Sequence, residues 1–160
     1  MAGVFPPLLL SFLMTSPYAE TVLVPVPDPE TWYRDGYAPL YEADPAGNIE
    51  AMIGYYAASV ESHYEDGTIK TVSAHDFVAL HIEGALADGW LTSKLQDLQV
   101  EPLNRTTASF KASWIDRYEG EPDGLLLCDW RLADFVDGAW KFTTYVDLDC
   151  ASHGFLPHDN

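Results

Sequence analysis

Asp129 and Arg131 lie two residues apart in a run of apolar residues, a spacing that places two side chains on one face of a β-strand. The simpler interpretation is a structural ion pair, because a buried charge needs a partner. In the alternative, Arg131 binds an anion or a carbonyl group, and Asp129 is a general base whose pKa rises in an apolar pocket. The sequence favours the ion pair and leaves the catalytic role open.

His81 and the tyrosines of the N-terminal half are the other candidate groups. His81 follows Phe77 by four residues, so it is either a hydrogen-bonded core histidine or a general acid or base near neutral pH. The densest aromatic cluster consists of Tyr33, Tyr37, Tyr41, Tyr55 and Tyr56. Core packing explains these rings most simply, with hydroxyl groups that reach the boundary of the core. The histidines and cysteines have no metal-ligand spacing, and we expect neither a metal nor a cofactor.

Three long runs must position these groups in a sheet. They lie near 106–118, 124–136 and 139–149, and are separated by EGEPD and by Asp137-Gly138. An Asp-Gly pair between apolar runs is a strong signal for a hairpin, so we predict an antiparallel meander of three long strands. Residues 91–103 are expected to form a further strand before them.

The alternation of side chains predicts which residues share a face. If Asp137-Gly138 is a two-residue turn, Val136 lies opposite Ala139, and Cys128 lies opposite Asp147. Cys150 is then on the other side of the sheet from Cys128, so we predict two free thiols. One face is largely apolar with a few polar groups, which is typical of a binding pocket. It comprises Ala108, Phe110, Ala112, Trp114, Asp116, Leu127, Asp129, Arg131, Ala133, Phe135, Trp140, Phe142, Thr144, Val146 and Leu148.

Helices are predicted in the N-terminal half. Asp28-Pro29-Glu30 has the residues of a helix start, and so has Asp44-Pro45. From the second start, an apolar stripe with helical spacing predicts a helix over 45–62. Ser73 begins a third helix, which ends near Asp88-Gly89.

Composition limits the possible partners. The 160 residues carry a net charge of −17, which disfavours nucleic acid and anionic membranes. Residues 1–27 form an extension with an apolar run that ends near Ala19, without the positive charges of a signal peptide. The sequence favours a cytoplasmic location; secretion or a periplasmic location is the alternative if residues 1–19 are a signal peptide. We expect one domain over 28–150 and a tail over 151–160.

The order of the predicted elements resembles the nuclear transport factor 2-like superfamily, specifically its SnoaL-like branch. The resemblance spans residues 28–150 and is carried by TASFKASWIDRYEG and WRLADFVDGAWKFTTYVDLD, in which the hairpin turns at Asp137-Gly138-Ala139-Trp140. It implies a cone-shaped α+β fold, also called cystatin-like, with three N-terminal helices packed on a curved antiparallel sheet. It also raises the expectation of a homodimer formed through the sheet, because the outward face is too apolar for open water.

The resemblance leaves the reaction open, because the scaffold serves isomerases, dehydratases, cyclases and binding modules. In resembling enzymes a helix tyrosine polarises a carbonyl while a sheet carboxylate moves a proton. One hypothesis is a protein that binds a small hydrophobic molecule, with or without such acid/base chemistry; the alternative is a non-catalytic interaction module whose cone is filled. The predicted catalytic residues are Asp129, His81 and Tyr37. The predicted ligand-binding residues are Arg131, Tyr33, Tyr56, Phe110, Trp114, Asp116, Trp140, Phe142 and Thr144.

Overall fold

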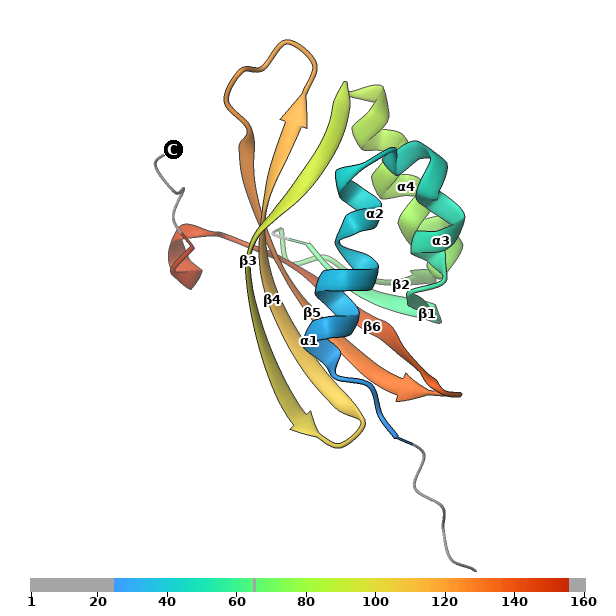
Figure 1. Cartoon of the computed structure of the whole chain (residues 1–160). Helices are drawn as coiled ribbons and strands as arrows, with labels where there is room; N and C mark the ends of the chain where they lie inside the picture. The colour runs from blue at the N-terminus through green and yellow to red at the C-terminus, as the bar shows by residue number, and fades with distance from the viewer. Residues whose placement is uncertain (1–24, 65, 156–160) are drawn as a thin grey trace, which may run out of the picture.

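A curved six-stranded sheet is the frame of the protein, and helices cover one of its faces (Figure 1). The computed structural model describes residues 25–64 and 66–155, so the signal-like segment lies outside the described residues. The strands are β1 (Tyr56–His63), β2 (Ile69–Ser73), β3 (Trp90–Asn104), β4 (Thr107–Tyr118), β5 (Leu125–Val136) and β6 (Ala139–Leu148). The α-helices are α1 (Pro29–Thr31), α2 (Pro39–Glu42), α3 (Ile49–Ile53) and α4 (Ala74–Ala87). A π-helix, η1 (Trp32–Tyr37), and two 3₁₀ helices, η2 (Pro45–Asn48) and η3 (Ala151–His153), complete the elements of the described residues.

The predicted meander is confirmed, and the predicted α+β class with it. Strands β3, β4, β5 and β6 pair antiparallel in chain order. The hairpin between β5 and β6 turns at Asp137 and Gly138, whose φ angles are 53° and 84°, so both residues have the left-handed conformation of a type I′ turn. The sheet order β2-β1-β6-β5-β4-β3 places the final hairpin in the middle of the sheet.

Two predicted helix starts are confirmed by their caps. The Asp28 carboxylate accepts a hydrogen bond from the Thr31 N–H at 2.7 Å, and the Ser73 hydroxyl accepts one from the Asp76 N–H at 3.0 Å. Helix α4 ends beside Gly89, which has a φ of 86°. In the described part of the chain, no helix is long and apolar enough to cross a membrane.

The predicted helix over 45–62 is wrong beyond Ile53. Residues 56–63 form β1, which pairs with β2 and runs parallel to β6. Tyr56 and Val60 are both buried, and their spacing of four fits a helix stripe as well as a strand that is irregular between Tyr56 and Glu61. Hydrogen bonding to β6, including Phe142 N–H to the Tyr55 carbonyl at 2.9 Å, decides in favour of the strand.

The prediction of two free thiols is also wrong, because the final hairpin contains a β-bulge. Ala133 pairs with Phe142, but Leu132 pairs with Thr144, so Thr143 is an extra residue in β6. Cys128 therefore lies opposite Leu148, and the chain turns after β6 so that Cys150 forms a disulfide with Cys128, with a Cα–Cα distance of 5.3 Å.

The same bulge changes which side chains of β6 face the helices. Tyr145 and Asp147 lie opposite Arg131 and Asp129, so they share the inner face of the sheet. Thr144 and Val146, which the two-residue turn alone placed on that face, are on the other side.

Aromatic rings fill the space between η1 and the sheet. The rings of Tyr33 and Phe110 stack with centroids 5.3 Å apart, and the rings of Tyr37 and Phe142 meet at 4.9 Å. The Trp140 indole N–H donates to the Pro27 carbonyl at 2.9 Å. All five side chains are buried, so this end of the cone is closed core.

Candidate functional site

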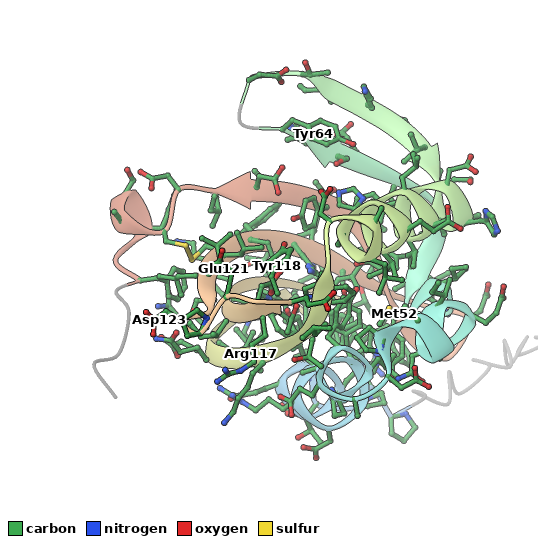
Figure 2. All side chains as sticks on the ribbon, turned by 90° about the horizontal axis from the view of Figure 1, so that it is seen from above. Met52, Tyr64, Arg117, Tyr118, Glu121 and Asp123 are labelled. Carbon is green, nitrogen blue, oxygen red and sulfur yellow. A yellow bond between two sulfur atoms is a disulfide. The ribbon has the colours of Figure 1, made fainter. Side chains whose placement is uncertain are left out.

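The other end of the cone contains a cavity of about 490 Å³. Its walls come from α4 on one side and from the inner face of β3, β4, β5 and β6 on the other. Rings and aliphatic groups form most of the wall, and four aspartates lie among them: Asp116, Asp129, Asp147 and Asp149. The disulfide, the yellow bond in Figure 2, is part of the lining and lies at the same end of the sheet as the β4–β5 loop, which carries Glu121 and Asp123.

A buried ion pair forms the floor of the cavity. The Arg131 guanidinium donates from Nε and Nη2 to the two oxygens of Asp129, at 2.9 and 2.8 Å, and the Trp114 indole N–H donates to the same carboxylate at 3.0 Å. Burial raises the pKa of Asp129, and the bond from Trp114 opposes this rise. Three donors already occupy the carboxylate, so the geometry favours a structural pair over a free general base.

Arg131 also holds a relay of three phenols. Its Nη1 donates to the hydroxyls of Tyr37 and Tyr56, and the Tyr37 oxygen lies 2.7 Å from the oxygens of both Tyr41 and Tyr56. Since Arg131 occupies one lone pair of Tyr37, that hydroxyl accepts from one of the other two phenols and donates to the other. The accepting phenol, Tyr41 or Tyr56, does not donate its own proton to Tyr37, and both side chains line the cavity.

The phenols stay protonated over the ordinary pH range. Burial raises the pKa of Tyr41 and of Tyr56 well above the value of a tyrosine in water. Each is thus a hydrogen-bond donor, and the nearby guanidinium increases its strength as a donor.

Asp116 is the carboxylate best suited to exchange a proton. It is 7% exposed, lies opposite Ser93 across the β3–β4 ladder and lines the cavity. Burial raises its pKa from 3.8 to about 6, against a smaller opposing effect of the Ser93 hydroxyl. No described Lys or Arg forms an ion pair with it, in contrast to Asp129.

His81 presents a defined ring to the same cavity. Its Nδ1 lies 2.7 Å from the carbonyl of Phe77, and a carbonyl can only accept, so Nδ1 carries the proton. In the neutral ring, Nε2 is then left as an acceptor. The ring packs against Phe77 and Tyr145, with centroids 4.3 and 5.6 Å away.

The structure brings half of the predicted site residues to the cavity. Those that line it are Asp129, His81, Arg131, Tyr56, Trp114 and Asp116. Tyr37 lies behind Tyr41 and Tyr56 in the relay, while Tyr33, Phe110, Trp140 and Phe142 belong to the closed core. Thr144 is on the outer face because of the bulge.

Sequence reasoning missed Tyr145 and Asp147, which the bulge turns inward, and it did not single out Tyr41 within its aromatic cluster. The spacing of Tyr41 four residues after Tyr37 was the available signal for a shared helix face. No comparable signal marked the bulge.

Metal binding finds no support in the described ranges, where no three His, Cys, Asp or Glu side chains are grouped so as to hold an ion. The residues present instead offer a buried carboxylate, phenol donors and apolar walls. These groups can hold an organic molecule, polarise one of its oxygens and move a proton.

No family model and no curated protein matches the sequence, but solved structures match the fold. An NTF2-like protein from Novosphingobium aromaticivorans superposes with a TM-score of 0.56 at 15% identity, over 76% of this chain and 82% of that one. An NTF-2-like protein of unknown function from Shewanella oneidensis MR-1 superposes with a TM-score of 0.55 at 14% identity, over 72% of this chain and 92% of that one. A candidate polyketide cyclase from Xanthomonas campestris pv. campestris superposes with a TM-score of 0.51 at 18% identity, over 76% of this chain and 90% of that one. The protein has the cystatin-like fold that is found in these NTF2-like structures.

Proposed function

We propose that the protein binds a small, largely apolar molecule in the cavity and transfers a proton on it without a cofactor. The observation that carries this proposal is the open cavity of about 490 Å³, which lies within the size range of small-molecule sites. An interaction module with a filled cone would have closed core at both ends. The fold comparison adds a candidate polyketide cyclase among the similar structures.

Asp116 is the base in this proposal, and the hydroxyl of Tyr41 or Tyr56 is the hydrogen-bond donor to the ligand. A carboxyl with a pKa of about 6 is mostly ionised at neutral pH and still accepts a proton readily. The phenol, linked to Arg131 directly in the case of Tyr56 and through Tyr37 in the case of Tyr41, would stabilise the negative charge that develops on a carbonyl oxygen when a neighbouring carbon loses a proton. His81 is a second candidate for receiving that proton, whereas Asp129 orients Arg131.

Ligand binding is tested by filling the cavity. In a fluorescence titration we expect one molecule of β-naphthol to bind per chain. Ala85→Trp should abolish this binding, because Ala85 lines the cavity from α4 and the larger side chain would occupy it. Leu80→Trp on the exposed face of the same helix is the matched control and should bind normally. Equal binding by both variants would mean that the probe sits elsewhere.

Proton transfer is tested with an enolisable ketone, β-tetralone, in D₂O. We expect the protein to accelerate deuterium exchange at the carbon next to the carbonyl, and we expect Asp116→Asn to lose at least about 100-fold of this rate. Asp137→Asn, at the hairpin turn, makes the same change of charge outside the cavity and should exchange normally. Normal exchange in the Asp116 variant would remove that residue from the mechanism.

A homodimer through the sheet is a second proposal, carried by the outward face. Trp130, Leu132 and Val146 are only half-buried there, on neighbouring strands. A second copy would cover these apolar groups. Sedimentation velocity should give a dimer, and Trp130→Glu should give a monomer; a monomeric wild-type protein would contradict this expectation.

A further inference from the structure

We infer that the ligand of this cavity carries a positive charge, as an apolar molecule with a protonated amine that binds against Asp147. The inference rests on the proposed function and goes beyond it by naming the charge class of the ligand. Three observations support it: the pairing of carboxylates across β5 and β6, the group of rings that includes Tyr145, and the charge balance of the cavity wall.

Asp129 and Asp147 are direct partners across the β5–β6 ladder, so two carboxylates face the same side of the sheet next to each other. Like charges in such a pair destabilise a sheet. Arg131 forms its ion pair with the carboxylate of Asp129 alone. No ion pair among the described residues involves Asp147. Asp147 accepts one hydrogen bond, from the Tyr145 hydroxyl at 2.7 Å. A cation in the cavity would therefore relieve an unfavourable pair of charges.

Tyr145, whose hydroxyl donates to Asp147, belongs to a group of three rings in the cavity lining that could receive such a cation. The Arg131 guanidinium already lies 5.3 Å from the centroid of the Tyr145 ring, which shows that this ring accommodates a cation. The rings of Phe77 and Tyr145 have centroids 5.2 Å apart, and the ring of His81 contacts both. A ring face attracts an ammonium group, most strongly where water is displaced. In its neutral form the ring of His81 adds an acceptor at Nε2, and all three rings line the cavity. The combination of a carboxylate with aromatic faces suits an organic ammonium group.

The balance of charge on the wall points the same way. Among the described lining residues, four aspartates face one arginine, and that arginine is already paired with Asp129. The net charge of −17 on the whole chain makes the surrounding potential negative as well. An anionic ligand would meet a wall with more carboxylates than cations, whereas a neutral ligand would leave Asp147 without a charge partner. The apolar walls require that the amine be attached to an apolar body.

The test compares three probes that share one apolar body: phenylbutylamine, phenylbutanol and phenylbutyrate. Isothermal titration of the full chain at neutral pH should show that the amine binds about tenfold more tightly than the alcohol, and the acid most weakly. Asp147→Asn keeps an acceptor for the Tyr145 hydroxyl but removes the charge. It should abolish the advantage of the amine and leave the alcohol unchanged, which also shows that the variant is folded. Asp137→Asn, the matched control, should retain the advantage.

Each other outcome overturns a definite part of the inference. If none of the three probes binds, the proposed pocket function fails, and the inference with it. If the alcohol or the acid binds most tightly, the pocket stands and the cationic class is wrong. If the amine binds most tightly in Asp147→Asn as well, the ammonium group is not held by Asp147.

Discussion

Asp116 shows how burial, without a charged partner, can raise the pKa of a carboxyl group. It has no cationic partner among the described residues, so burial raises its pKa to about 6. The folded state then binds this proton more tightly than the unfolded state, whose pKa stays near 3.8. Between these two values, the contribution of Asp116 to stability falls as the pH rises. Above the higher value the ionised group costs about 3 kcal/mol.

Asp116→Asn should therefore stabilise the protein at pH 8 by up to about 3 kcal/mol, because asparagine resembles the protonated acid without its charge. Near pH 4 the gain should disappear. Urea unfolding of both proteins at the two pH values measures the difference, and the comparison cancels the contribution of other titrating groups. A gain of equal size at both pH values would show that the side chain is not charged in the folded state at pH 8.

At the residue scale, the sequence predicted the ion pair between Asp129 and Arg131 and the inward direction of Asp116 and Trp114. Alternation along a strand was sufficient for these residues. It did not predict the relay of Tyr37, Tyr41 and Tyr56, because two of these phenols come from the helical segment and one from β1. Only the packing of the helices on the sheet brings their oxygens together.

At the scale of elements, hairpin strands and capped helices were predictable because their signals are local. Asp137-Gly138 defines a turn and Ser73 defines a helix start from adjacent residues alone. The bulge at Thr143 and the strand β1 depend on pairing with a distant segment, Phe142 in the case of β1. An apolar spacing of four in 56–60 fits either structure, so the tertiary partner decides between them.

Two glycines allow the same substitution to be tested in opposite local structures. Gly138 has a φ of 84° in the hairpin turn, and Gly84 lies within α4; an added Cβ would contact nothing within 4 Å at either position. Gly138→Ala should destabilise the protein by about 1 kcal/mol, because alanine rarely adopts a positive φ. Gly84→Ala should stabilise it by about 0.5–1 kcal/mol through helix propensity. Thermal unfolding of both variants checks the signs, and equal signs would contradict the assigned conformations.

At the scale of the whole molecule, the disulfide bears on both stability and location. It links residues 22 apart in sequence and joins β5 to the segment that follows β6. Disulfides persist in oxidising compartments, so we propose that the protein works in one, in agreement with the secreted or periplasmic alternative. Phe155, a few residues further on, is buried, so part of the segment after the predicted domain packs on the rest of the protein.

Removing this link should lower the free energy of unfolding by about 3 kcal/mol. The measurement is urea unfolding of Cys128→Ser/Cys150→Ser beside the wild-type protein, with and without a reducing agent. The reductant should destabilise the wild-type protein and leave the double variant unchanged. Thiol labelling of the wild-type protein in denaturant without reductant should give no adduct, and two labelled cysteines would contradict the disulfide.

The parallel pairing of β1 with β6 also has a consequence for synthesis. Of the six strands of the described sheet, β6 is the last to leave the ribosome, yet it occupies the middle of the sheet, between β1 and β5. Until it emerges, β1 and β2 cannot join the other strands. Partners such as Glu61 and Thr144 meet only after all six strands of the described sheet have been made, and contacts so distant in sequence slow folding. The nascent chain must therefore keep two separate groups of strands from aggregating until its final hairpin arrives to unite them.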